Sequence, residues 1–148
     1  MNGSLFTHIL VPTDGSDAAV EAGRLAFRIA KAYDARVTVV YVLDLEVVKH
    51  SARISDESRS EIEAHMSWEG QRYLDHLEDI ARRLGVSVSR ETREGNPHKE
   101  IVALGEEIGA DLIVIGHAGR RGMERKVVGS VAERVTRFAH CPVLVVKD

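Results

Sequence analysis

Apolar residues follow two patterns along this chain, short continuous runs and longer stripes with helical spacing. The runs lie at residues 8–11, 36–43, 112–115 and 142–146, with a weaker alternation at 86–93. The stripes begin near residues 17, 58, 97 and 130. Short apolar runs are typical of buried strands, and stripes that repeat every three or four residues predict amphipathic helices. The pattern therefore predicts strands that alternate with helices.

This alternation predicts an α/β fold, in which an open parallel sheet carries helices on both faces. Residues 36–43 fit such a sheet because they are nearly all apolar, as expected of a strand covered on both sides. Ligands of these sheets bind beyond the carboxyl ends of the strands, where the winding direction reverses. If the first strand is central, the loops at Asp14 and Gly116 share that crevice. With 148 residues, the chain is interpreted as a single domain, residues 1–148.

Two further segments carry less regular patterns. Residues 44–57 show no clean period and are interpreted as a loop or a short irregular helix. Residues 58–84 carry one long apolar stripe, which predicts a long amphipathic helix. Trp68 on this helix is interpreted as a core residue in preference to a partner surface.

The composition is that of a folded protein without a strong charge. Apolar residues make up 44% of the chain and charged residues 29%, which excludes a disordered chain. The net charge of −3 gives no reason to expect a nucleic-acid partner. No segment approaches the roughly 18 apolar residues of a membrane span, so we expect a cytoplasmic protein. The single cysteine, Cys141, cannot form an internal disulfide and is interpreted as a buried, unreactive thiol.

The segment after the fourth strand has the composition of an anion-binding loop. Its glycines and basic residues are Gly116, Gly119, Gly122, Gly129, Arg120, Arg121, Arg125 and Lys126, against one acid, Glu124. A helix start follows at Ser130, and helix starts carry free amides and a partial positive charge. Glycines let a ligand approach the main chain. The interpretation as a phosphate-binding loop is therefore favoured over that as an ordinary surface loop.

Two residues of this region also have ordinary structural interpretations. The four residues from Ser130 to Glu133 fit a capping box, in which the two side chains satisfy amides at the helix start. Asp14 precedes Gly15 and fits an Asx turn. For Ser130 and Asp14, the structural role and the ligand role are left as equal alternatives.

Known phosphate-binding motifs narrow the choice. No GxxxxGK[ST] motif occurs, which excludes a P-loop ATPase, and the loop spacing does not match GxGxxG. The spacing Gly116-x2-Gly119-x9-Gly129-Ser130 is present instead, with PTDGS at residues 12–16 and CPVLVV at residues 141–146. Together these segments resemble the ATP-binding branch of the universal stress protein family over essentially the whole chain. The resemblance implies a Rossmann-like, HUP-type sheet of five parallel strands in the order 3-2-1-4-5.

The resemblance also implies a ligand, ATP, with Mg²⁺ carried on its phosphates near Asp14 and no dedicated metal site. The adenine would lie near Val42 and Pro12, Asp14 would approach the ribose or a metal-bound phosphate, and the glycine loop would wrap the phosphates. The implied nucleotide-binding residues are Pro12, Thr13, Asp14, Val42, Gly116, His117, Ala118, Gly119, Arg120, Arg121, Gly122, Gly129, Ser130, Val131 and Ala132. Family loops usually carry serine or threonine and then histidine between the first two glycines. Here His117 and Ala118 stand there, so a hydroxyl is missing.

Three functions fit this chain. The first is a nucleotide-dependent regulatory module of the stress response, binding ATP, ADP or a cyclic nucleotide. The second is an enzyme, either a slow ATPase or a nucleotidyl transferase. The loop supplies no evident nucleophile and base, and no HxGH motif occurs, so no catalytic residue is assigned, although His117 could act as a general acid. The third is a dimeric scaffold without a nucleotide. Binding is favoured over catalysis.

The last strand predicts association with a second copy of the chain. If it lies at the sheet edge, the apolar run Val143, Leu144, Val145 and Val146 leaves open hydrogen-bonding groups, which favours aggregation. Pairing with the same strand of a second copy about a two-fold axis removes that edge. Family members often dimerise in this way, so the resemblance also implies a homodimer.

Overall fold

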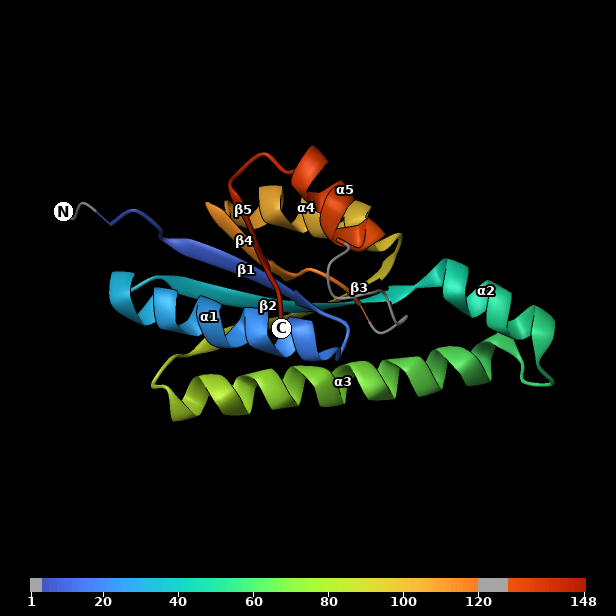
Figure 1. Ribbon diagram of the computed structural model, residues 1–148. Coiled ribbons are helices and arrows are strands. Elements are labelled where there is room, and N and C mark those ends of the chain that lie inside the picture. Colours follow the sequence, from blue (N-terminus) through green and yellow to red (C-terminus); the bar gives the residue numbers. More distant parts are fainter. Residues whose placement is uncertain (1–3, 120–127) are drawn as a thin grey trace.

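Five parallel strands form one sheet in the order β3-β2-β1-β4-β5, the order that the family resemblance implied (Figure 1). The computed structural model describes residues 4–119 and 128–148. The strands are β1 (His8–Thr13), β2 (Arg36–Asp44), β3 (Val88–Gly95), β4 (Leu112–Gly116) and β5 (Val143–Val146). The helices within these ranges are α1 (Asp17–Tyr33), α2 (Leu45–Ile54), α3 (Arg59–Arg83), α4 (Pro97–Ile108) and α5 (Ser130–Phe138). The predicted α/β fold class is confirmed.

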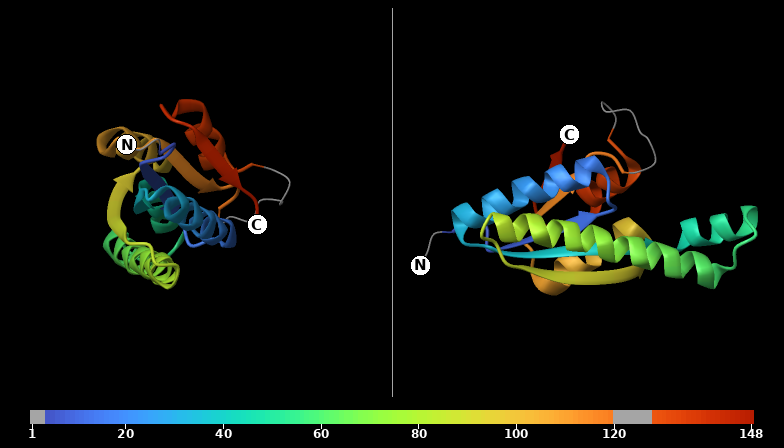
Figure 2. Two further views of the ribbon diagram at one scale, coloured as in Figure 1. Left: turned by 90° about the vertical axis from the view of Figure 1, so that its left-hand side faces the viewer. Right: turned by 90° about the horizontal axis from the view of Figure 1, so that it is seen from below.

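Helices cover both faces of the sheet, with α1 and α3 on one side and α4 and α5 on the other (Figure 2). Successive residues of β1 divide between the two cores, Ile9 on the α1 side and Leu10 on the α4 side, and all of β1 is buried. Phe27 of α1 and Leu104 of α4 are fully buried, and burial of such a side chain contributes about 2 kcal/mol. Among the described residues, no helix is both long and apolar enough to cross a membrane.

The amino ends of β1 and β4 are tied together by Asp111, the residue before β4. Its carboxylate accepts hydrogen bonds from the amide of Thr7 at 2.9 Å, the hydroxyl of Thr7 at 2.8 Å and the amide of His8 at 3.1 Å. The ring of His8 is buried beside them, with Nε2 at 2.8 Å from the Thr38 hydroxyl of β2. Burial, and then the positive charge of Arg36, lowers the pKa of the His8 imidazole. These contacts hold the amino ends of β1, β2 and β4 together.

The carboxyl ends of β1 and β4 are arranged differently. β1 pairs with β2 along its whole length, from His8 to Thr13. It pairs with β4 only at Ile9 and Leu10, so these two strands part towards their carboxyl ends. The winding direction reverses between these strands, as predicted, and this is where open α/β sheets bind ligands.

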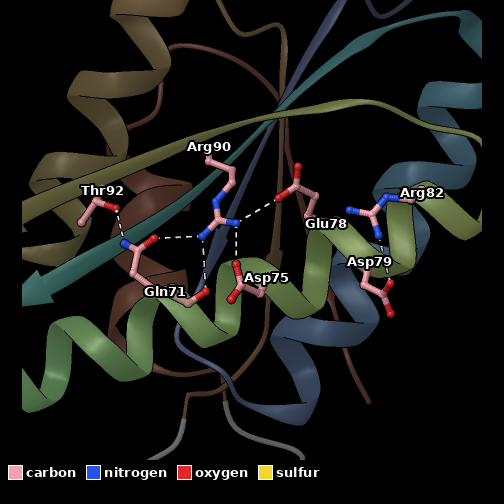
Figure 3. A network of polar contacts seen from close by, with 7 residues as sticks. All are labelled: Gln71, Asp75, Glu78, Asp79, Arg82, Arg90 and Thr92. Atoms are coloured by element: carbon pink, nitrogen blue, oxygen red, sulfur yellow. Dashed lines mark hydrogen bonds and ion pairs between the residues drawn. The ribbon is translucent and has the colours of Figure 1, made fainter.

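The long helix α3 is held to β3 by Arg90 (Figure 3). One guanidinium nitrogen donates to Asp75 at 2.6 Å and to Glu78 at 2.9 Å, and the other donates to the Gln71 side chain at 2.9 Å. The hydrogen bond to Asp75 raises the pKa of Arg90, so the guanidinium stays charged. Asp75, Glu78 and Gln71 are all on α3, so one side chain of an edge strand fixes two turns of the helix.

Two segments differ from the sequence-based expectation. The segment interpreted as a loop or irregular helix forms α2, a regular helix of 10 residues. Asp44 caps it by accepting from the amides of Glu46 at 3.0 Å and Val47 at 3.3 Å. Only Val48 of α2 is buried, which explains why the sequence shows no clean period. The strand predicted at 86–93 begins two residues later, at Val88.

The interpretation of Trp68 as a core residue is wrong, because its side chain is 59% exposed. Nine residues separate Trp68 from the buried Leu77, and at about 100° per residue this places them on opposite sides of α3. The exposed indole stacks on His65, with ring centroids 6.3 Å apart, and the Arg72 guanidinium carbon lies 5.1 Å from the ring centroid. These two contacts stabilise an aromatic side chain that the core does not cover.

The two edges of the sheet differ in character. β3 reads VSRETREG, and its charged side chains discourage pairing with another chain. β5 reads VLVV at the opposite edge, as predicted, and Leu144 is 36% exposed. Cys141, shortly before β5, is half-buried, and burial raises the pKa of its thiol.

Candidate functional site

The turn between β1 and α1 is fixed by its own side chains. The amide of Gly15 donates to the Thr13 hydroxyl at 3.1 Å, and the amide of Ser16 donates to Asp14 Oδ1 at 3.0 Å. The second contact is the Asx turn that the sequence allowed for Asp14. Gly15 has φ of 81°, a left-handed conformation that favours glycine. The Ser16 hydroxyl then caps α1 by accepting from the amide of Ala19 at 3.1 Å.

The same turn contacts the residues that follow β4. Asp14 Oδ2 lies against Gly119 so closely that a Cβ on this glycine would collide with it. The Ser16 hydroxyl donates to the carbonyl of Ala118 at 3.4 Å. The two loops therefore meet, as predicted, and Asp14 both builds its own turn and reaches the glycine loop.

Gly116 supports the site in a different way. A Cβ at this position would lie 2.7 Å from the Ala18 carbonyl carbon and 2.8 Å from the Ala19 nitrogen, both main-chain atoms of α1. Glycine is therefore required for the close approach of α1 to the end of β4. Its role is to bring the turn at Asp14 next to the glycine loop.

The start of α5 is not the predicted capping box. Gly129, with φ of −67° and ψ of 161°, is the N-cap, and Ser130 is the first helical residue. The cap falls there because the Gly129 amide donates to the His117 carbonyl at 2.6 Å, while the Gly129 carbonyl accepts from the Glu133 amide at 2.9 Å. Within the described part of the chain, no side chain caps this helix.

The amides of the first turn of α5, on Ser130, Val131 and Ala132, precede the first helical hydrogen bond. They lie at the positive end of the helix dipole, beside the main chain of His117 and Ala118, because a Cβ on Gly129 would fall 3.3 Å from the His117 carbonyl oxygen and 3.4 Å from the Ala118 Cα. We call Gly119, Gly129 and the amides of residues 130–132 the amide cradle. Such a group of main-chain amides suits an anion.

His117 follows β4 and has an unusual environment. Its side chain is 2% exposed, and neither ring nitrogen has a hydrogen-bond partner among residues 4–119 and 128–148. The Asp148 carboxylate lies close to the ring, with Oδ1 3.9 Å from Nδ1. Leaving a buried donor without a partner costs about 1–3 kcal/mol, so a ligand acceptor here would recover stability.

The two residues expected near an adenine lie at the same end of the sheet. Pro12 is buried in β1. Thr13 pairs with Tyr41 of β2, so Val42 lies level with Asp14 at the carboxyl edge. Val42 is half-buried and packs on the α4 side. Arg120, Arg121 and Gly122 lie outside the described residues.

Sequence reasoning missed two tyrosines at this edge. Tyr41 is the last residue of β2 that pairs with β1, and Tyr73 of α3 meets it edge to face with ring centroids 6.0 Å apart. Burial, and then Tyr73, raises the pKa of Tyr41 to about 12, so its hydroxyl stays protonated. Tyr73 belonged to the predicted apolar stripe, but no sequence motif links it to residues 12–16.

Residues 5–147 match the model of the Universal stress protein family. A universal stress protein of Methanocaldococcus jannaschii is 46% identical over 145 residues, which cover 97% of this chain and 84% of that protein. The universal stress protein from Archaeoglobus fulgidus in complex with dAMP has a TM-score of 0.67 at 28% identity, over 97% of this chain and 99% of that one. A universal stress protein in complex with cAMP has a TM-score of 0.69 at 26% identity, over 96% and 97%.

Proposed function

Because this chain belongs to the universal stress protein family, we propose that it binds an adenine nucleotide, ATP, and acts as a nucleotide-dependent regulatory module of the stress response. The observation that carries the proposal is the amide cradle, whose helix start has no side-chain cap from residues 4–119 and 128–148. The relatives in complex with dAMP and cAMP support an adenine nucleotide as the ligand class.

In this proposal each part of the nucleotide meets a different part of the edge. The phosphates take hydrogen bonds from the amides of residues 130–132 in the amide cradle, at the positive end of the α5 dipole. The adenosine lies towards Pro12, Thr13 and Val42, at the carboxyl ends of β1 and β2. The buried ring of His117 gains an acceptor if a phosphate oxygen reaches it.

A magnesium ion fits the charges of this arrangement. The Asp14 carboxylate lies beside Gly119, so a phosphate bound there would be placed next to another negative charge. Mg²⁺ carried on ATP phosphates would offset that repulsion, and Asp14 supplies the carboxylate oxygen that Mg²⁺ prefers.

Isothermal titration calorimetry of the purified protein tests the proposal. We expect saturable ATP binding with a Kd on the order of micromolar, a free energy of about −8 kcal/mol, and weaker binding when EDTA removes the magnesium. Titrations with ADP and cAMP then show how the affinity depends on the phosphate groups of the nucleotide. No binding at millimolar ATP would contradict the proposal and favour a scaffold without a nucleotide.

Slow ATP hydrolysis is a second candidate, and one observation favours it. His117 is buried next to the cradle with Asp148 nearby, and a histidine beside a carboxylate is a common general acid or base. Phosphate release followed over hours, in wild type and in His117→Gln, separates the two functions. Release that stops in the variant while ATP still binds would establish the enzyme.

We also propose that the chain forms a homodimer through β5, the apolar edge strand. Val145 packs on the α4 side of the sheet, so a charge there would disturb the core as well as the edge. Leu144 is the exposed position of β5, and Leu144→Lys is expected to convert a dimer into a monomer in size-exclusion chromatography with light scattering. Ser89→Lys on the opposite edge is the matched control and should leave the mass unchanged. A Leu144→Lys protein that remains dimeric would refute this interface.

A further inference from the structure

Two contacts between a tyrosine ring and a glycine pack α3 against the carboxyl edge of the sheet. The ring of Tyr41 occupies the space where Gly70 of α3 would carry a Cβ, and the ring of Tyr73 occupies the corresponding space at Gly15. Gly70 and Tyr73 are three residues apart and so share one side of the helix. The two rings meet edge to face at 6.0 Å. α3 is therefore fitted to β2 through one contact and to the turn after β1 through the other.

The contact at Gly15 acts on the turn that carries Asp14. Gly15 meets the Tyr73 ring, while its neighbour Asp14 meets Gly119. The turn thus contacts both α3 and the amide cradle. Gly15 also has the left-handed φ of 81°, so the turn has a special conformation that its surroundings must maintain.

We propose that Tyr73 is a positioning residue for the nucleotide site, because its ring, packed on Gly15, fixes the turn that holds Asp14 against the glycine loop. This inference rests on the proposed nucleotide binding. Any repulsion between an incoming phosphate and the Asp14 carboxylate that Mg²⁺ leaves uncompensated pushes the turn away from the cradle. The Tyr73 ring packs against Gly15 and so restrains the turn, and α3 is in turn held in place by Arg90.

Substitutions of Tyr73 separate the ring contact from other effects. Tyr73→Phe keeps the ring, so its Kd for ATP is expected to stay within about twofold of wild type, whereas Tyr73→Ala is expected to raise Kd by about tenfold or more. Ile80→Ala is the matched control, because Ile80 is buried on the same helix but is absent from these contacts. It should lower the melting temperature as much as Tyr73→Ala does, while Kd stays near the wild-type value.

Hydrogen exchange of the protein without nucleotide tests the same claim independently of ATP. The amides of Gly15 and Ser16 are hydrogen-bonded within the turn, and their exchange is expected to accelerate about tenfold in Tyr73→Ala but not in Ile80→Ala. If wild type binds no ATP, the proposed function fails, and the exchange result alone decides whether Tyr73 holds the turn.

Three outcomes would overturn the inference. The first is exchange at Gly15 and Ser16 that is the same in Tyr73→Ala and Ile80→Ala. The second is equal weakening of ATP binding in these two variants, which would reduce Tyr73 to general stability. The third is Tyr73→Phe binding ATP as weakly as Tyr73→Ala, which would assign the effect to the hydroxyl.

Discussion

Gly116→Val is expected to lower the free energy of unfolding by about 3 kcal/mol, because the new side chain has no space next to α1. Its Cβ would lie 2.7 Å from the Ala18 carbonyl carbon and 2.8 Å from the Ala19 nitrogen. Both are main-chain atoms, so relief requires movement of the whole first turn of α1. Urea unfolding followed by circular dichroism measures the change.

Gly109→Ala is the control for this substitution. Gly109 ends α4 with φ of 67°, and a Cβ there meets no atom of the described residues within 4 Å. The alanine therefore carries only backbone strain, about 1 kcal/mol. Equal losses in Gly116→Val and Gly109→Ala would show that α1 does not pack against Gly116 as described. Because Gly116→Val disturbs the fold, it is a poor probe of ligand binding.

Ser130→Pro is expected to weaken ATP binding by roughly 10- to 100-fold while leaving stability nearly unchanged. Ser130 is the first residue of α5, a position that proline favours, and Gly129 before it has the extended conformation that proline requires. The substitution removes one amide donor of the cradle without breaking the helix. Calorimetry gives the affinity, and thermal unfolding gives the stability.

The Ser130→Ala variant completes this experiment, since it removes the hydroxyl and keeps the amide. If the main chain binds the phosphates, Ser130→Ala should bind ATP within a fewfold of wild type. Equal losses in Ser130→Ala and Ser130→Pro would instead assign the contact to the hydroxyl.

The order of the strands could be predicted from the sequence, because the strands have local apolar patterns and the order itself is implied by the family resemblance. The apolar run at Leu112 marks a buried strand by itself, and the spacing from Gly116 to Ser130 carries the family resemblance. The N-cap of α5 could not be predicted in the same way. Its cap depends on the hydrogen bond from the Gly129 amide to the His117 carbonyl, two residues far apart in the chain. A capping motif in the sequence could not reveal that bond.

Trp68 and Tyr73 show that the position of a residue around the helix, and not only its aromatic character, determines its burial. Both are aromatic residues of α3, but Trp68 lies opposite Leu77 around the helix, and Tyr73 lies on the buried side. Following each residue at about 100° per step would have separated them. The partner of Tyr73 was beyond such reasoning, since Gly15 comes 58 positions earlier in the sequence.

The glycines of the site show a further limit. Gly116 and Gly119 look equivalent in the sequence, and the spacing motif includes both. In the structure, Gly116 accommodates the main chain of α1, whereas Gly119 lies against the Asp14 carboxylate. Only the three-dimensional contacts distinguish a packing glycine from one at the candidate site.

Two-dimensional amide NMR during an ATP titration is the most direct test that main-chain amides bind the phosphates. The amide signals of Gly119, Ser130, Val131 and Ala132 are expected to shift most, while those of Gly85 and Gly109, at the far ends of α3 and α4, stay in place. Saturable ATP binding that leaves the four cradle signals unmoved would contradict this claim.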